Sequence, residues 1–362
     1  MFLEEAAQKW ENRHPMSVGR KADHLRICTE MAVEFRDKST WLEDVHLLHD
    51  ALAEGSLDEI STETRFMGRR LAAPLMISAM SGGLAAAQAL NRDLAKAAQE
   101  LGIGLGLGSQ RPMLDDPSAI DSYAVRRFAP DIPILGNIGL QQAAAAGPAR
   151  IEKLVTSIDA DGLAIHLNPA QELAQAEGDK RFPDGAKTLK ALTKRMPGRV
   201  VVKETGCGIS RETALRIKAA GVKTLDIAGA GGTSWTRVEN LRKGADPSRR
   251  TWLDEWGIPT AASLVETSDL GLELVASGGL RTGLDAAKCI ALGADVCGFA
   301  LPVLRAYASG GYSGALFFLQ QVIMDLKVVM LLVGAKDIAA LKKVRPVITG
   351  RLQEWTISRS RK

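Results

Sequence analysis

Two glycine-rich segments late in the chain have the composition of phosphate-binding turns. The first is Asp226-Ile-Ala-Gly-Ala-Gly-Gly-Thr-Ser-Trp235, and the second is Ala276-Ser-Gly-Gly-Leu-Arg-Thr-Gly-Leu-Asp285. Glycine lets the backbone approach a phosphate closely, and free N–H groups at the start of a following helix favour the negative charge. Either segment alone also fits an ordinary tight turn. Because each follows a short apolar run, the pair predicts two turns that hold a phosphate.

Lys203 directly follows the apolar run Val200–Val202, so its ammonium group is predicted to lie at the end of a buried strand. Burying an ammonium is costly unless an anion compensates it. One interpretation is a salt bridge with a strand-end carboxylate such as Glu204 or Asp226. The other is a counter-ion for a cofactor that becomes negative. Flavin mononucleotide (FMN) fits this second interpretation, because it has one phosphate and a ring that carries negative charge when reduced.

A second polar cluster lies in the segment His166-Leu-Asn-Pro-Ala-Gln-Glu172. His166, Asn168 and Gln171 offer uncharged donors to an anionic oxygen, whereas Glu172 offers a carboxylate ligand. One carboxylate together with substrate phosphates is the usual way in which proteins hold Mg²⁺. Two other interpretations stay open: Glu172 as a carboxylate that complements a helix dipole, and His166 as a hydrogen-bonded histidine at a strand end.

Cationic residues suited to a diphosphate occur in two further places. Arg111 follows Ser109 closely, and Arg20 and Lys21 are adjacent near the start of the chain. Arginine binds phosphate through a planar fork, and lysine acts as a point charge. Plain surface charge is the alternative interpretation of the Arg20–Lys21 pair.

The elements that must position these residues alternate between short apolar runs and helical patterns. Eight strands, each followed by a helix or a long loop, predict an α/β fold of the (β/α)8 TIM-barrel type, with an open doubly wound sheet as the alternative. Active-site groups of such a barrel lie at the carboxyl ends of the strands. The expected strands are Leu75–Ala79, Ile103–Gly106, Ile132–Asn137, Gly162–His166, Val200–Lys203, Thr224–Ala228, Glu273–Ser277 and Val296–Phe299.

Three segments are predicted along the chain. Residues 1–70 form an extension that acts as a lid or plug, contains the hairpin strand Glu63–Met67 and contributes substrate contacts. Residues 71–310 form the FMN-binding barrel. Residues 311–362 form helices packed on the barrel and end in a basic tail, Arg359–Lys362, whose composition is typical of a solvated end.

Composition excludes several classes of protein. The net charge of +4 gives no reason to expect a nucleic-acid partner, and the four cysteines show no metal-binding spacing. The first eighteen residues are too polar for a signal peptide. The apolar stretch Ala315–Gly334 contains Gln320, Gln321, Asp325 and Lys327, which predicts a mostly buried or interface helix rather than a membrane span. We therefore expect a cytoplasmic protein without a membrane partner.

Taken together, these motifs resemble the type 2, FMN-dependent isopentenyl diphosphate isomerases. The specific parts are the His-x-Asn pattern with Gln-Glu shortly after it, and the tryptophan that closes the first glycine turn. Ser81 stands where that family usually has threonine, a change that keeps the hydroxyl group. The matching stretches are Arg20–His24, Ser78–Gly83, Gly108–Arg111, Asn137–Gly139, His166–Glu172, Val202–Glu204, Gly229–Trp235 and Ser277–Gly283.

The resemblance implies roles for individual residues. Gln171, His166 and Lys203 are expected to act in catalysis, and Glu172 to bind Mg²⁺. The implied contacts with the diphosphate substrate are Arg20, Lys21, Ser109, Gln110, Arg111, His166, Asn168 and Gln171. The implied contacts with FMN are Ala79, Met80, Ser81, Ser109, Asn137, Lys203, Thr233, Gly279, Leu280, Arg281, Ala300 and Leu301.

The implied reaction is the allylic interconversion of isopentenyl diphosphate and dimethylallyl diphosphate, with FMN reduced by NADPH and Mg²⁺ on the diphosphate. Similar enzymes are tetramers or octamers. An FMN-dependent 2-hydroxy-acid oxidase is the main alternative, but that family has a histidine where this chain has Gly229–Thr233. A nucleotide dehydrogenase with a catalytic-loop cysteine would have to use Cys207, which follows the wrong strand. A barrel that binds flavin without catalysis is the third alternative.

Overall fold

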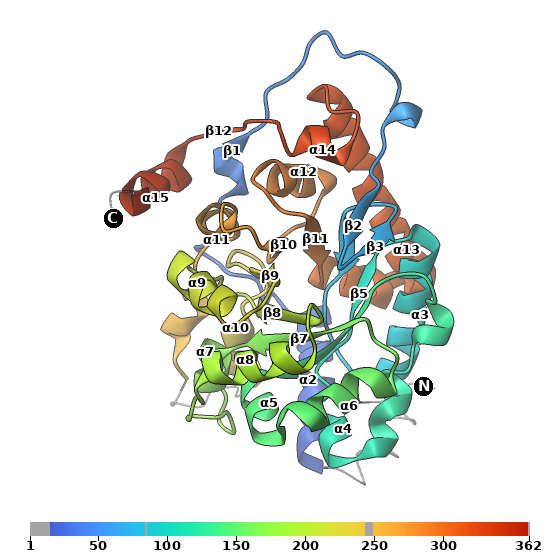
Figure 1. Ribbon diagram of the computed structural model, residues 1–362, viewed down its shortest axis with the longest axis vertical. Coiled ribbons are helices and arrows are strands. Elements are labelled where there is room, and N and C mark those ends of the chain that lie inside the picture. The colour runs from blue at the N-terminus through green and yellow to red at the C-terminus, as the bar shows by residue number, and fades with distance from the viewer. Residues whose placement is uncertain (1–14, 84, 243–248, 361–362) are drawn as a thin grey trace.

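The computed structural model describes residues 15–83, 85–242 and 249–360 and contains a closed barrel of eight parallel strands (Figure 1). The strand order around the barrel is β10-β11-β4-β5-β6-β7-β8-β9, so neighbouring strands follow the chain. All eight predicted strands are present, which confirms the barrel over the open sheet. Their bounds are β4 Leu75–Ile77, β5 Gly104–Gly106, β6 Ile134–Gly139, β7 Gly162–Leu167, β8 Val200–Glu204, β9 Thr224–Asp226, β10 Glu273–Ser277 and β11 Val296–Phe299.

Helices lie between successive strands and cover the outside of the barrel (Figure 1). The strands are rich in Val, Ile and Leu because they are buried on both faces, between these helices and the barrel interior. The helices are α3 Ala85–Leu101, α4 Arg111–Asp115, α5 Leu140–Ala146, α6 Pro148–Ser157, α7 Pro169–Ala174, α8 Gly185–Arg195, α9 Arg211–Ala219, α10 Trp235–Arg242, α11 Thr260–Thr267 and α12 Gly283–Ala291. Short 3-10 helices are η1 Leu42–Asp44, η2 Leu57–Glu59, η3 Pro117–Ser122, η4 Arg126–Phe128 and η5 Thr251–Glu255.

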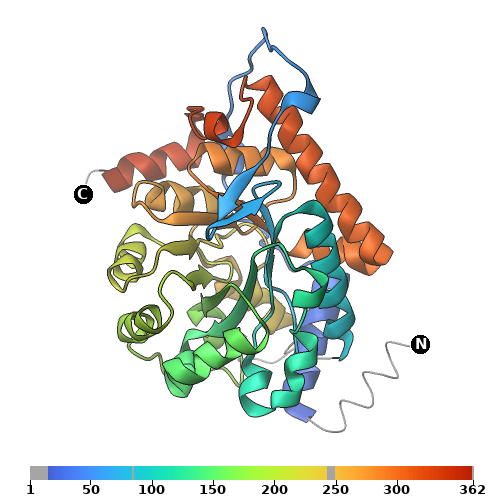
Figure 2. The same cartoon turned by 45° about the vertical axis from the view of Figure 1, so that its right-hand side comes forward.

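The expected hairpin closes the amino-terminal end of the barrel. Strand β2 (Thr64–Phe66) pairs with β3 (Arg69–Leu71), and this hairpin lies across the ring of strands in Figure 2. Phe66 and Leu71 are fully buried in one cluster with apolar residues of five barrel strands: Met76, Leu135, Val201, Val275 and Val296. A plug at this end leaves the carboxyl end of the barrel for ligands.

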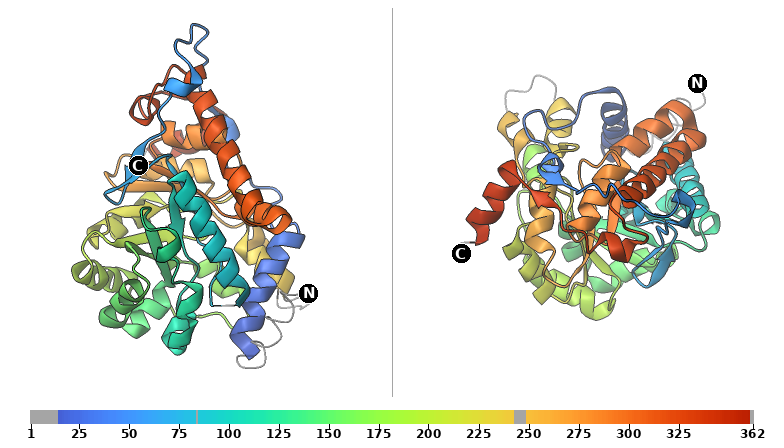
Figure 3. Two further views of the ribbon diagram at one scale, coloured as in Figure 1. Left: turned by 90° about the vertical axis from the view of Figure 1, so that its right-hand side faces the viewer. Right: turned by 90° about the horizontal axis from the view of Figure 1, so that it is seen from above.

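The segment before the hairpin lies at the opposite end. Helix α2 (Pro15–Glu30) packs against α10 and α13 beside the carboxyl ends of the strands (Figure 3). Glu34 forms a bridge with Thr233, and Phe35 N donates to Gly232 O at 3.0 Å. The predicted extension therefore serves both ends: α2 on the mouth and the hairpin on the base. Residues 1–14, on which the signal-peptide prediction depends, lie outside the described residues.

The last strand is followed by one long helix, α13 (Leu301–Leu332), which contains non-helical backbone at Gly310 and Gly311. This kink falls at the predicted boundary near residue 310, although the division into three segments stays a prediction. Helix α13 packs on α12 and α3 (Figure 3). It is long and apolar enough to cross a membrane, yet only 28% of its most apolar window is buried. The prediction of a mostly buried helix is therefore wrong, and the alternative prediction, an interface helix, stays a prediction.

The carboxyl-terminal segment forms α14 (Ile338–Leu341), β12 (Val347–Ile348) and α15 (Gly350–Ser360). Strand β12 pairs with β1 (Val45–His46), which ties the end of the chain to its beginning. The prediction that the basic tail is solvated is wrong for Arg359. Its guanidinium contacts the buried carboxylate of Glu266 at 2.7 Å and also pairs with Glu212. Trp355 Nε1 donates to the same Glu266 at 2.8 Å. Residues 361 and 362 lie outside the described part.

Candidate active site

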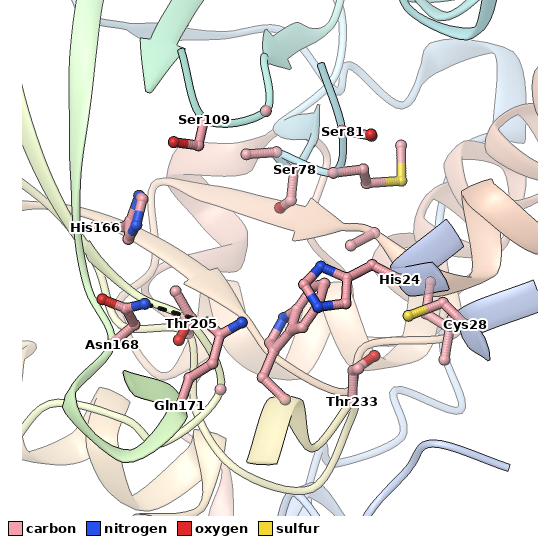
Figure 4. Close-up of a pocket in the computed structure, with 18 of the residues that line it drawn as sticks. His24, Cys28, Ser78, Ser81, Ser109, His166, Asn168, Gln171, Thr205 and Thr233 are labelled. Atoms are coloured by element: carbon pink, nitrogen blue, oxygen red, sulfur yellow. Dashed lines mark hydrogen bonds between the residues drawn. The ribbon is translucent and has the colours of Figure 1, made fainter. Parts of the chain in front are cut away.

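A cavity of about 230 Å³ opens at the carboxyl ends of the strands. Residues at or shortly after the carboxyl end of each of the eight barrel strands line it together with helix α2, as expected for a TIM-barrel site. Figure 4 shows Ser78, Ser81 and Ser109 on one side, His166 and Asn168 on a second, and His24 and Cys28 reaching in from α2. Every predicted site residue lines this cavity except Gln110. The structure thus brings together residues that lie up to 281 positions apart in sequence, from Arg20 to Leu301.

The two glycine turns have different positions. Gly278 and Gly279 line the cavity with positive φ angles of 96° and 85°, a conformation that favours glycine. Gly232 instead packs on the second turn: a Cβ there would lie 2.3 Å from Gly279 N. The first turn therefore contributes Ala228, Thr233 and Trp235 to the cavity, while its Gly232 packs against the second turn. We therefore retain the predicted phosphate site for the second turn only.

The second turn has the properties of a site for the FMN phosphate. The hydrogen bonds among the described residues use neither the Gly279 nor the Leu280 amide, and both residues line the cavity together with Arg281. The helix after this turn was expected to add its amides, but Asp285 caps them in a capping box with Thr282. Helix α13 takes that place, because its start at Ala300–Leu301 lines the cavity without a side-chain cap or an acidic residue in its first turn. These groups fit a phosphate monoester.

The salt-bridge interpretation of Lys203 is confirmed, whereas its role as a counter-ion for a cofactor stays a prediction. Its ammonium Nζ lies 3.7 Å from Asp226 Oδ2 and donates to the Glu204 carbonyl, while the side chain also lines the cavity. Glu204 Oε2 accepts from the amides of Thr205 and Gly206 at 2.6 and 2.7 Å, so this carboxylate shapes the loop after β8. Burial raises the pKa of Glu204 to about 7, against the effect of those amides. A positive charge therefore lies beside the position expected for the flavin.

His166 is held as a neutral imidazole. Its Nδ1 lies 2.7 Å from Asn137 Oδ1, and burial, followed by the charges of Lys203 and Lys21, lowers its pKa to about 3. With Asn137 Oδ1 as the acceptor, the proton is on Nδ1 and Nε2 is an acceptor. The donor role predicted toward an anionic oxygen requires the other tautomer. Gln110 supports this pair from behind: it is fully buried, and its Oε1 accepts from Asn137 N at 3.0 Å.

Arg20, Lys21 and Arg111 form a cluster of positive charge at the mouth. Lys21 Nζ donates to neutral acceptors, the carbonyls of Gly82 and Ser109 and the Tyr123 hydroxyl. Burial and then the nearby Arg20 and Arg111 lower the pKa of Lys21 to about 7. The Arg20 Nε is buried without a hydrogen-bond partner among the described residues. An anionic ligand would stabilise the partly buried Arg20 and Lys21, which lie beside the exposed Arg111.

Both carboxylate oxygens of Glu172, the predicted Mg²⁺ ligand, already accept hydrogen bonds from the protein. Its Oε1 accepts from Asn168 Nδ2 at 3.0 Å and its Oε2 from Asp179 N at 2.7 Å. Within the described residues, no group of three or more His, Cys, Asp or Glu side chains could hold an ion. A Mg²⁺ ion at Glu172 would therefore take most of its ligands from water and a substrate diphosphate, which is its common mode of binding.

Several residues in or behind the cavity were not assigned a role from the sequence, among them His24, Gln175 and Glu239. Glu239 is completely buried, and its Oε1 lies 2.9 Å from His24 Nε2, 3.0 Å from Gln171 Nε2 and 2.7 Å from Gln175 Nε2. Burial alone would raise the pKa of Glu239, but the contacts with His24, Gln171 and Arg242 lower it to about 2. For two of these unassigned residues helical spacing in the sequence could have indicated a place near the site, because His24 lies one helical turn after Arg20 and Glu239 one turn after Trp235.

Comparison with known proteins identifies the class. Residues 18–115 and 137–346 match the FMN-dependent dehydrogenase family, and the chain belongs to this family of flavin-binding barrels. Within it, the chain is 42% identical over 351 residues to the isopentenyl-diphosphate delta-isomerase of Pyrococcus abyssi, covering 94% of this chain and 95% of the relative. It is 43% identical over 338 residues to the isopentenyl-diphosphate delta-isomerase of Methanothermobacter thermautotrophicus, covering 93% and 95%.

Solved structures of other flavoproteins share the architecture. A mandelate oxidase variant with an FMN adduct is 17% identical with a TM-score of 0.61 and covers 96% of this chain and 100% of its own. A flavocytochrome b2 variant is 18% identical with a TM-score of 0.65 and covers 90% and 82%. At this level of identity the likeness shows the fold alone. It gives no support to the 2-hydroxy-acid oxidase alternative as an activity.

Proposed function

We propose that this protein interconverts isopentenyl diphosphate and dimethylallyl diphosphate, with reduced FMN as cofactor and Mg²⁺ on the diphosphate. One observation carries the proposal: a single cavity has two separate regions suited to phosphate. One is the second glycine turn with Arg281 and the start of α13, and the other is the Arg20–Lys21–Arg111 cluster. A cofactor with one phosphate and a substrate with a diphosphate, bound at the same time, each need one such region.

The substrate diphosphate is assigned to the cation cluster, with Ser109, His166 and Asn168 beside it and Glu172 as the protein ligand of Mg²⁺. Arginine forks and a buried lysine recognise phosphate oxygens by charge and geometry. The side chains of Leu25, Cys28, Met80, Trp235 and Leu304 also line the cavity and suit a short hydrocarbon chain. The substrate has both parts.

The reaction moves a double bond by one carbon, so a proton is added at one carbon and another is removed two carbons away. When bound, reduced FMN supplies an electron-rich ring and an acid/base group close to these carbons. Lys203 balances the negative charge of the reduced ring. Gln171 donates through Nε2 to Glu239 Oε1 at 3.0 Å, which orients its amide toward the substrate. The neutral His166 positions the substrate beside Asn137.

Further parts of the proposal concern the cellular setting. NADPH is proposed as the reductant, and the four cysteines, all unpaired, suit a reducing cytoplasm.

A homo-oligomer, a tetramer or an octamer, is proposed because α13 presents an apolar outer face. Phe317 is 62% exposed, Met324 48% and Leu332 43% on that helix. Size-exclusion chromatography with light scattering tests this state, and a Phe317→Glu variant should shift it toward smaller species.

The activity is tested by anaerobic incubation with FMN, NADPH, Mg²⁺ and isopentenyl diphosphate, followed by product analysis. Dimethylallyl diphosphate should form only when flavin is present and reduced. Omission of NADPH and Mg²⁺, one at a time, shows which of them the enzyme needs. Parallel oxygen-uptake assays with lactate and mandelate test the oxidase alternative. Bound, reducible FMN without any allylic product would contradict the proposed isomerase.

A further inference from the structure

Asp226 is the buried carboxylate nearest to Lys203, and its position follows from the barrel register. Lys203 of β8 and Asp226 of β9 are direct neighbours across the two parallel strands. Partners in this register place their side chains on the same face, here the barrel interior. Asp226 is 4% exposed, so its charge requires compensation within the protein.

Each oxygen of Asp226 has a separate task. Oδ1 accepts from the Ser277 hydroxyl at 2.6 Å and from Ala228 N at 3.2 Å, which fixes the carboxylate in one orientation. Oδ2 is then left facing Lys203 Nζ at 3.7 Å. Since Ser277 belongs to β10, groups from three consecutive strands define the position of one ammonium group.

Asp226 does not reach the ligand cavity. Lys203 lines both this cavity and a smaller one beneath it in the barrel interior, whereas Asp226 lines only the smaller one. The contacts of the carboxylate with residues of the ligand cavity are those with Lys203, the Ser277 hydroxyl and the backbone at Ala228. The route through Lys203 can be separated from the other two by experiment.

From this geometry we infer that Asp226 is a positioning residue: its carboxylate holds the Lys203 ammonium in place and directs it at the flavin. The inference rests on FMN binding in the cavity, which is part of the proposed function. Asp226→Asn keeps an oxygen for Ser277 and Ala228, removes the negative charge, and replaces the oxygen that faces Lys203 by an NH2 group. An uncharged partner leaves a buried ammonium without compensation, so its contribution to flavin binding falls.

A double-mutant cycle tests this route, with FMN dissociation constants measured by fluorescence titration of the full-length apoprotein. For groups in direct contact we expect Asp226→Asn to raise the Kd of FMN about tenfold in the wild-type background. In a Lys203→Met background the same substitution should change the Kd by less than about twofold, because its target is gone. The visible spectrum of bound FMN should also shift in the same direction in both single variants.

The matched control is Asp295→Asn, which also removes a carboxylate that contacts a lysine (Lys342) and a backbone amide (Leu274), but at the amino-terminal end of the barrel. Its FMN Kd should equal that of the wild type. Asp226→Ala is the second variant if Asp226→Asn is not folded by circular dichroism. An equal increase of Kd in both backgrounds, or none in the wild type, would overturn the inference and leave FMN binding intact. A wild-type protein that binds no FMN would overturn both.

Discussion

We predict that the charge of Lys21 lowers the free energy of unfolding of the ligand-free protein and that the same charge binds the substrate. Its buried ammonium group has only neutral acceptors, and its pKa falls from 10.5 to about 7. At about 1.4 kcal/mol for each pKa unit, this corresponds to roughly 5 kcal/mol against folding when the lysine is fully charged in both states. Lys21→Met removes the charge with little change in length.

The sign of the pH dependence follows from proton binding. Between pH 7 and 10.5 the unfolded chain holds the Lys21 proton more strongly than the folded protein, so rising pH stabilises the wild type. The penalty is complete below about pH 7 and disappears as the pH approaches 10.5. Relative to Lys21→Met, the wild type should gain roughly 2–3 kcal/mol between pH 6 and pH 9.

The assay is urea denaturation of both proteins without substrate, at pH 6, 7, 8 and 9, in the presence and absence of inorganic pyrophosphate. Comparing the two proteins at each pH cancels the titration of all other groups. Pyrophosphate should stabilise the wild type much more than the variant, because it pairs with the Lys21 charge. A stability difference that stays constant with pH, or equal stabilisation of both proteins by pyrophosphate, would refute the reasoning.

Three other predictions concern separate parts of the molecule. Gly279→Ala should abolish FMN retention, because its Cβ would lie 2.3 Å from Thr40 Cγ2. Retention is measured as the flavin absorbance of the purified protein. The control is Gly68→Ala, which has a similar φ of 80° but open space around the Cβ and should keep FMN. Glu239→Gln should lower kcat about tenfold or more with little change in the KM for isopentenyl diphosphate, since it disturbs Gln171 and His24 behind the substrate. Equal changes in kcat and FMN affinity would contradict that role. Arg359→Ala, at a half-buried pair, should lower the Tm by no more than a few degrees without changing activity; a loss of activity would assign α15 a part in the site.

The barrel was predictable because its signals are local. Runs such as Val200–Val202 and Leu274–Ala276 are apolar and β-branched, as strands buried on both faces must be. The site followed from the same reading, since polar residues directly after each run meet at one end of a parallel barrel. Lys203 is the clearest example: its type and position after a strand indicated both the cavity and a buried counter-ion.

Side-chain direction and packing between distant segments were not predictable. Gln110 belongs to a substrate-binding motif by sequence, yet its side chain turns back to Leu154 and Asn137. The first glycine turn has the composition of a phosphate site, but its glycines allow close contact with the second turn. Arg359 looked like a solvated end because its partner Glu266 is 93 residues away in sequence. Each outcome depends on a neighbour that only the folded chain supplies.

Closure of the barrel base by the β2–β3 hairpin also determines the order in which ligands can exchange. Phe66 and Leu71 block that end, and α2, sixteen residues long, spans the opposite rim with Lys21, His24 and Cys28 facing inward. A flavin in the proposed position, on Lys203 and the second glycine turn, would be the innermost occupant. It would have to bind before the diphosphate and could leave only after the diphosphate has left. Flavin exchange should therefore be slow and should stop while substrate is bound.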